Sequence, residues 1–225
     1  MKKMMLLMAA ISGATSAMAN PFFVGLKAIP EMQYRRFGDN AANKSLNSIN
    51  KPSFWYSVGI VSGMDLTKKL ELESGLLLQM AGYRTDELTL TDQTGKTIGT
   101  TRDNYRGLYL NLPVLVNYSF AQISKVKVYG TLGVVNGFKI AAETVTHNSL
   151  TDGGSNKKTE TNTAFEGYRL SAMAGVGIAA QLSENLSARM APSFQYDILP
   201  GLNRDAGLKG YLWSAGLSCS VIYKI

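Results

Sequence analysis

The sequence predicts an all-β protein, an eight-stranded antiparallel up-and-down transmembrane β-barrel. Three observations support this fold class. Eight long runs alternate with period two, one face of each run lacks charge, and the aromatic residues of that face gather near the strand ends. Period-two alternation is the pattern of a strand whose two sides meet different surroundings. We therefore expect the uncharged sides to face lipid.

The N-terminal residues have the pattern of a signal peptide. The basic pair Lys2-Lys3 precedes an apolar run over residues 4–11, and Ala17-Met18-Ala19 supplies a small-residue cleavage site. This run is shorter than the ~20 residues that a membrane-spanning helix needs. We expect a signal peptide over residues 1–19, cleavage after Ala19, and one barrel domain over residues 20–225 in the cell outer membrane.

The expected strands cover most of the remaining chain. They span residues 22–35, 54–66, 70–82, 108–120, 126–140, 168–182, 186–198 and 211–225. In the last run Trp213 and Val221 fall on one face, and Ser214 and Ser220 fall on the other. Across all runs the apolar faces hold 59 positions without an Asp, Glu, Lys or Arg, whereas 12 of the 52 opposite positions are charged.

The apolar faces are expected to point outward. Runs of 13 to 15 residues exceed the roughly 5–6 residues of soluble strands, which argues against a soluble lipocalin-like barrel with an apolar interior. The opposite faces are rich in Gly and Ser, and such small residues fit the narrow lumen of eight strands. Aromatic girdles are expected at the periplasmic rim (Phe22, Tyr118, Phe120, Tyr223) and at the outer rim (Tyr34, Phe54, Tyr56, Phe138, Tyr168, Tyr196, Tyr211, Trp213).

The connections alternate between short and long. Residues 67–69, 121–125 and 183–185 are short turns, and residues 36–53, 83–107, 141–167 and 199–210 are long loops. Short periplasmic turns and long extracellular loops are typical of outer-membrane barrels. We expect residues 146–163 to form a flexible loop, and the sequence leaves open whether residues 85–102 extend their hairpin. Pro113 is expected to mark a bulge, because it cannot donate to a ladder.

The segment Leu108-Tyr109-Leu110-Asn111-Leu112-Pro113-Val114-Leu115-Val116-Asn117-Tyr118, followed by Tyr129-Gly130-Thr131-Leu132-Gly133, resembles a known family. It is similar to the PorT-like outer-membrane β-barrels of Bacteroidota, in which a Tyr-Leu-x-Ile-Pro-Leu-Leu strand precedes a Tyr-x-x-x-Gly strand. Asn111 stands where that family often has an acidic residue, and the chain ends in Ile225 rather than an aromatic residue. The resemblance implies a barrel fold and, in one branch, a role in protein secretion.

Twelve charged residues are expected to point into the lumen. They are Lys27, Glu31, Arg35, Asp65, Glu71, Glu73, Lys127, Lys139, Arg169, Arg189, Asp197 and Lys224. Seven are basic and five are acidic, so we expect a paired network that packs the lumen. Glu71 and Glu73 are expected to be partners of Arg189 or Lys127. A narrow ion or proton path is the alternative.

Catalysis and cofactor binding have little support in the sequence. His147, Ser149 and Asp152 share the third long loop and allow a base-activated hydroxyl, as in outer-membrane lipid-modifying enzymes. We expect no enzyme, however, because catalysis needs a fixed geometry. No cofactor and no metal site are expected. Cys219 is the only cysteine, which excludes an internal disulfide.

The net charge of +7 falls to +5 without Lys2 and Lys3. No basic stripe is interleaved with aromatics, so no nucleic acid partner is expected. Expected partners are outer-membrane lipid and lipopolysaccharide, the barrel-assembly machinery, and envelope or secretion proteins. The first long loop, with Arg36, Lys44 and Lys51 against Asp39, either rests on lipopolysaccharide phosphates or is simply solvated. We expect a structural, surface-interaction or secretion-accessory role through the loops, with a lipid-modifying enzyme or a narrow porin as alternatives.

Overall fold

The computed structural model describes residues 22–37, 47–48, 50–161, 164–204 and 208–225. The predicted signal peptide and its cleavage site at Ala19 lie outside these residues. Eight long strands form the barrel: β1 (Phe22–Phe37), β3 (Ser53–Asp65), β4 (Leu70–Thr85), β6 (Thr97–Ile123), β7 (Val126–Leu150), β9 (Tyr168–Gln181), β10 (Leu186–Asp197) and β12 (Leu208–Lys224). Four short strands accompany them: β2 (Asn50–Lys51), β5 (Leu88–Thr91), β8 (Ser155–Thr161) and β11 (Leu202–Arg204).

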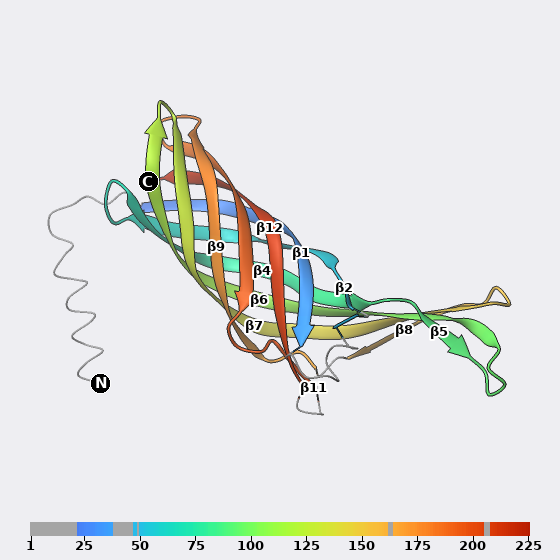
Figure 1. Cartoon of the computed structure of the whole chain (residues 1–225). Helices are drawn as coiled ribbons and strands as arrows, with labels where there is room; N and C mark the ends of the chain where they lie inside the picture. The colour runs from blue at the N-terminus through green and yellow to red at the C-terminus, as the bar shows by residue number, and fades with distance from the viewer. Residues whose placement is uncertain (1–21, 38–46, 49, 162–163, 205–207) are drawn as a thin grey trace, which may run out of the picture.

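The long strands close into a ring. Each pairs antiparallel with its neighbour along the chain, and β1 also pairs with β12, so that Lys27 lies opposite Gly59 on one side and Ser220 on the other. This confirms the predicted eight-stranded up-and-down barrel. The short turns and the end of β12 lie at the end of the barrel away from β5 and β8 (Figure 1). The described residues contain no helix long and apolar enough to cross a bilayer.

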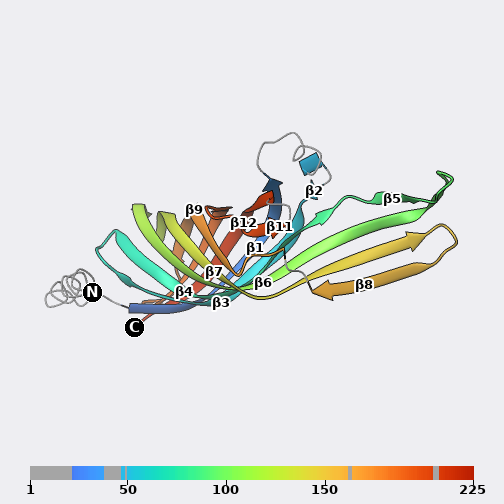
Figure 2. The same cartoon turned by 90° about the horizontal axis from the view of Figure 1, so that it is seen from below.

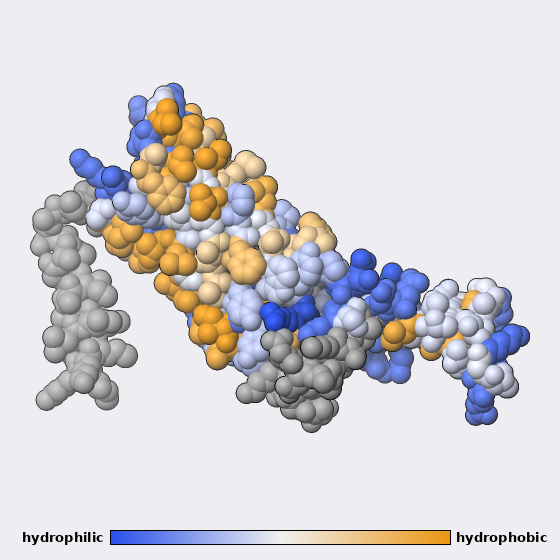
Figure 3. Space-filling view, in the orientation of Figure 1, coloured by the Kyte–Doolittle hydropathy of each residue, from blue (hydrophilic) through white to orange (hydrophobic). Residues whose placement is uncertain are grey.

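The wall of the barrel sorts its side chains as the alternation predicts. Leu26, Ile60 and Leu132 on the outer surface are 68%, 61% and 66% exposed, whereas the inward Val61 is fully buried. Apolar residues cover much of the barrel surface in Figure 3, and hydrophilic residues gather toward its ends and on the projecting strands. An aliphatic band between polar ends is the surface that lipid requires.

Aromatic rings pair on this outer surface near the strand ends. Tyr34 stacks on Trp213 with 4.1 Å between ring centroids, and Phe138 lies 5.4 Å from Tyr168, both toward the end that carries the long connections. Toward the opposite end Tyr118 and Phe120 lie 5.9 Å apart. These neighbours come from the girdle residues that the sequence singles out. The first two pairs join neighbouring strands, and cross-strand ring pairs also stabilise a sheet.

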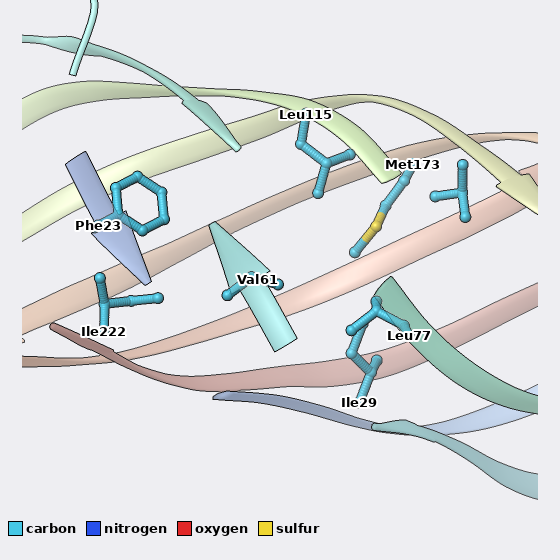
Figure 4. Close-up of a cluster of buried hydrophobic side chains, with 8 residues drawn as sticks. Phe23, Ile29, Val61, Leu77, Leu115, Met173 and Ile222 are labelled. Carbon is cyan, nitrogen blue, oxygen red and sulfur yellow. The ribbon is translucent and has the colours of Figure 1, made fainter. Parts of the chain in front are cut away.

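The middle of the lumen is apolar. A cluster of buried side chains fills it: Phe23, Ile29, Val61, Leu77, Leu115, Val135, Met173 and Ile222. In Figure 4 the labelled side chains converge from strands around the ring. Gly63 makes room for one of them, because a Cβ there would overlap the Phe23 ring. The small residues of the lumen face therefore accommodate large neighbours.

The prediction that residues 83–107 and 141–167 form loops is wrong, because most of these residues belong to strands. β6 and β7 run beyond the barrel, and β5 and β8 pair along their outer edges, so residues 88–161 include a projecting four-stranded sheet, here called the extension (Figures 1 and 2). A register shift between Leu108 and Tyr109 lies at its base. The expected flexible loop 146–163 is instead largely the β7–β8 hairpin, and residues 85–102 do extend their hairpin. Ladder bonds and β-branched residues such as Val145 outweighed the polar composition.

Pro113 does not mark a bulge. Ser74 pairs with Val114 and Leu77 with Asn111, so the β4–β6 register is the same on both sides of the proline. Neither register shift of the β6–β7 pair falls at this position. The physical reason is that a one-residue slip would exchange the lipid and lumen faces of the whole strand. The single ladder hydrogen bond that Pro113 cannot donate disturbs the sheet less than such a slip would.

Candidate functional site

The twelve charged residues predicted for the lumen lie on the barrel strands, and the structure encloses them to different degrees. Lys27, Glu31, Arg35, Glu73, Arg169, Arg189 and Asp197 are buried. Asp65, Glu71, Lys127, Lys139 and Lys224 are half-buried. The contacts of these residues fall into three groups along the barrel.

The first group lies toward the short turns. Arg189 makes a two-pronged contact with Glu71, with Nη1–Oε1 and Nη2–Oε2 distances of 2.5 and 2.8 Å. Glu73 contacts Lys27 and lies 3.9 Å from Arg189 Nη1. Arg189, one of the two alternative partners expected for these carboxylates, is confirmed, and Lys27 rather than Lys127 supplies the second cation. Fork geometry also favours arginine over lysine for a carboxylate.

Asn117 and Asp65 complete this group. The Asn117 amide donates to Glu71 Oε1 at 2.9 Å and to Glu73 Oε2 at 3.2 Å. Asp65 accepts from Lys224 at 2.5 Å near the end of the barrel. Each carboxylate of the first group therefore has a cationic partner, as burial of charge demands.

The second group surrounds Glu31, which is held without an ion pair to any described residue. Its Oε1 accepts from Gln79 Nε2 at 2.7 Å and Gln33 Nε2 at 3.1 Å, and its Oε2 accepts from Ser214 Oγ at 2.5 Å. Ser57 Oγ lies 3.3 Å from Oε1. The sequence reasoning missed these neutral donors, because it considered only charged lumen positions. Gln33 and Gln79 occupy the same alternating positions as the charged lumen residues, so this pattern could have indicated them.

The third group lies toward the extension. Asp197 is fully buried and accepts from Arg169 Nη2 at 2.9 Å, Ser171 Oγ at 2.7 Å and the Leu212 backbone N–H at 3.0 Å. Arg35 stacks over the Tyr83 ring at 3.7 Å and contacts Asn50. The Tyr83 ring face thus stabilises its charge through a cation–π contact.

A segment outside the strands caps this end of the lumen. Phe165 is buried against Tyr83, Tyr109, Leu202 and Leu212 in a second apolar cluster. Lys139 Nζ donates to the Phe165 carbonyl at 2.5 Å, and the Tyr109 hydroxyl donates to the Glu166 carbonyl at 3.0 Å. Side chains therefore fill the described barrel in the middle and at this end.

The residues of the hydrolase alternative do not form a triad. His147 lies on β7 opposite Arg102 and Lys157, between two cations. Ser149 is two positions along the same strand, which places the two Cα atoms about 7 Å apart. Asp152 accepts from the Gly154 backbone N–H at 3.0 Å within the hairpin turn. In the described part of the chain, no three His, Cys, Asp or Glu residues gather as metal ligands.

Exposed ion pairs lie on the extension and on the residues next to its base. Lys51 lies 3.1 Å from Asp86, Arg102 lies 3.8 Å from Glu87, and Arg106 lies 3.6 Å from Glu143. The hydrogen bond from Lys51, aided by the Glu87 backbone N–H, holds the pKa of Asp86 below its usual value. Of the basic loop predicted around Arg36, Lys51 is placed beside an acid, whereas Lys44 and Asp39 lie outside the described residues.

Several solved structures resemble this one. Neisserial surface protein A is 13% identical with a TM-score of 0.43, and the match covers 91% of this chain and 97% of that one. The attachment invasion locus protein of Yersinia pestis, solved with a heparin analogue, is 10% identical with a TM-score of 0.36 and coverages of 88% and 98%. The outer membrane protease OmpT of Escherichia coli is 7% identical with a TM-score of 0.41 and coverages of 94% and 100%.

The comparison with curated protein sequences finds no match. A family model described as "Outer membrane protein beta-barrel domain" matches residues 21–204. This stretch spans most of the chain and includes the strands from β1 to β11. Together with the closed ring and its apolar outer surface, the match places the protein in the outer membrane. The chain belongs to the outer membrane protein β-barrel domain family.

Proposed function

We propose that this protein works through its extension, as a structural, surface-interaction or secretion-accessory component of the outer membrane, and not as a channel or an enzyme. One observation carries the proposal. The lumen is filled by side chains, while a four-stranded sheet projects from the end with the long connections. By the rule that short turns are periplasmic, this sheet is extracellular.

The resemblance around residues 108–118 supports a finer assignment. We propose that the chain belongs to the PorT-like branch of Bacteroidota and that its partners are envelope or secretion proteins. Outer-membrane lipid and lipopolysaccharide would surround the barrel, and the barrel-assembly machinery would read β12, where Tyr223 and Ile225 keep the apolar alternation. Lumen packing argues against the porin alternative, so planar-bilayer recordings should show no stable conductance.

Shortening the extension tests the proposal. Residues 88–99 and 146–160 are each replaced by a two-residue Asn-Gly turn, and the strain is compared with wild type by cross-linked affinity purification and secretion assays. A matched control replaces the exposed Lys157 and Lys158 by Gln without shortening. We expect loss of cross-linked partners only in the shortened variant, with heat-modifiable folding intact. Unchanged partners and secretion would refute the proposal.

A further inference from the structure

The short-turn end of the barrel holds a cavity of about 130 Å³, here called the vestibule. Its walls come from three turns and the strands beside them, and Lys127, Tyr129, Arg189 and Lys224 line its sides. Short turns are periplasmic in outer-membrane barrels, so the vestibule opens toward the periplasm.

The vestibule carries an excess of positive charge. Six basic side chains line it (Lys68, Lys69, Lys125, Lys127, Arg189, Lys224) against three acidic ones (Asp65, Glu71, Glu184). Two of the acids are already engaged, because Glu71 pairs with Arg189 and Asp65 with Lys224. Four lysines therefore stand against Glu184, and none of them forms an ion pair with a described residue. A positively charged concavity with low-dielectric walls attracts anions.

Two residues of the vestibule wall carry buried donors without a hydrogen-bond partner among the described residues. The Arg189 side chain is 8% exposed, and its Nε has no hydrogen-bond partner among the described residues. Ser187 Oγ, two residues away and also in the vestibule wall, has none either. A buried donor left without an acceptor is costly, so such groups call for an explanation. Neither atom is open to the cavity, so an anion in the vestibule would meet the Ser187 hydroxyl only after its rotation and would be held chiefly by the lysines.

The vestibule does not continue as a passage. The Arg189 guanidinium lies 5.3 Å from the centroid of the Phe23 ring, which belongs to the apolar cluster that fills the middle of the lumen. A charged solute that enters from the periplasm therefore meets hydrocarbon, where an ion is poorly tolerated. The geometry suits binding rather than transport.

We propose that the vestibule binds a phosphate group presented from the periplasmic side. Phosphate is compact and carries several strong acceptor oxygens, which suits flexible lysines on several turns better than a planar carboxylate does. Glu71 occupies the two Nη atoms of Arg189, so the lysines of the vestibule are the donors that remain for the ligand. The phosphate belongs either to a free periplasmic anion or to a phospholipid headgroup of the inner leaflet.

Calorimetric titration of the full-length protein, folded in phosphatidylcholine nanodiscs, tests the proposal. Inorganic phosphate is one probe and short-chain phosphatidylglycerol is the other. We expect Lys127→Gln to weaken binding of the effective probe about tenfold, as loss of one charge-assisted hydrogen bond implies. Lys157→Gln on the extension is the matched control and should leave binding unchanged. Lys125→Gln, in an exposed turn, serves as a second variant that does not touch the strand ladder.

The outcomes separate the two sources. Binding of inorganic phosphate that depends on Lys127 identifies a free anion site, and binding of only the short-chain lipid identifies a headgroup site. Absence of binding by both probes to folded protein overturns the proposal. Equal weakening by Lys127→Gln and Lys157→Gln also overturns it, because the interaction would then be unspecific attraction to a basic protein. Neither result depends on the extension, so the proposed function is tested separately.

Discussion

The lumen and the extension use the same charged residue types in opposite ways. In the lumen, Arg169 and Asp197 have side chains that are 4% and 0% exposed, and the carboxylate also accepts from Ser171 and Leu212. In the extension, Arg106 and Glu143 are 36% and 46% exposed at 3.6 Å. Burial removes water as an alternative partner, so lumen pairs are obligatory whereas extension pairs are exchangeable.

The comparison also holds for apolar residues. Leucine on the barrel wall faces hydrocarbon, and leucine on the extension faces water. One sheet continues from lipid into solvent without a break in β6 or β7, so the medium and not the backbone decides what each position tolerates. Matched substitutions on the barrel wall and on the extension test whether the surrounding medium sets the free-energy cost of each change.

The largest effect is expected for Asp197→Ala. Removal of the carboxylate leaves the buried Arg169 guanidinium without its counter-charge, which should lower the free energy of unfolding by about 3–5 kcal/mol. Urea titration in micelles, followed by the fluorescence of Trp55 and Trp213, measures the change. If the free energy of unfolding falls by less than it does when an exposed ion pair is removed, water reaches Arg169.

A matched pair of substitutions tests the two media. Leu132→Arg places a charge near the middle of the lipid-facing wall and should cost about 2–4 kcal/mol. Leu150→Arg, at the end of β7 in the extension, should change the unfolding free energy by no more than about 0.5 kcal/mol. The same urea titration in lipid bilayers compares them. Equal effects would contradict the assignment of the barrel wall to lipid.

A smaller effect is expected for Glu143→Ala. The exposed Arg106–Glu143 pair is screened by solvent, so its loss should cost less than about 1 kcal/mol and should become negligible at high salt. Denaturation at low and high ionic strength measures both quantities. A salt-independent loss above this range would show that the pair is shielded.

The smallest effect concerns the β5–β6 turn. Asp92 accepts from the Thr94 hydroxyl at 2.6 Å and from the Thr94 and Lys96 backbone N–H groups, led by the hydroxyl, and these bonds lower its pKa from 3.8. A lowered pKa means that the turn is supported above the usual titration range of aspartate and loses this support as pH falls through the folded pKa. NMR titration should show Thr94→Val moving that pKa upward. An unchanged midpoint would assign the shift to the backbone donors.

Several elements of the barrel were predictable from the sequence because they depend on local alternation. The eight strand windows, the uncharged outer face and the short turns follow from period two and from residue type. The extension was not predictable, because Thr, Asn and Lys in residues 144–161 have a loop-like composition. Only the pairing of β7 with β6 and of β8 with β7 makes them strands. Pro113 misled for the same reason, since its register is set by both neighbouring strands.

The candidate site divides in the same way. Alternation placed Glu71 and Arg189 on one face, yet the partners of Glu73 and Glu31 come from strands far apart in the sequence. Phe165, which caps the lumen, lies outside every predicted strand. The sequence by itself determined which side of each strand meets lipid, because that choice depends on the side chain alone. Only the tertiary structure decided which charges meet, where the lumen closes and where a cavity remains, because closure of the ring brings together residues that no local pattern relates.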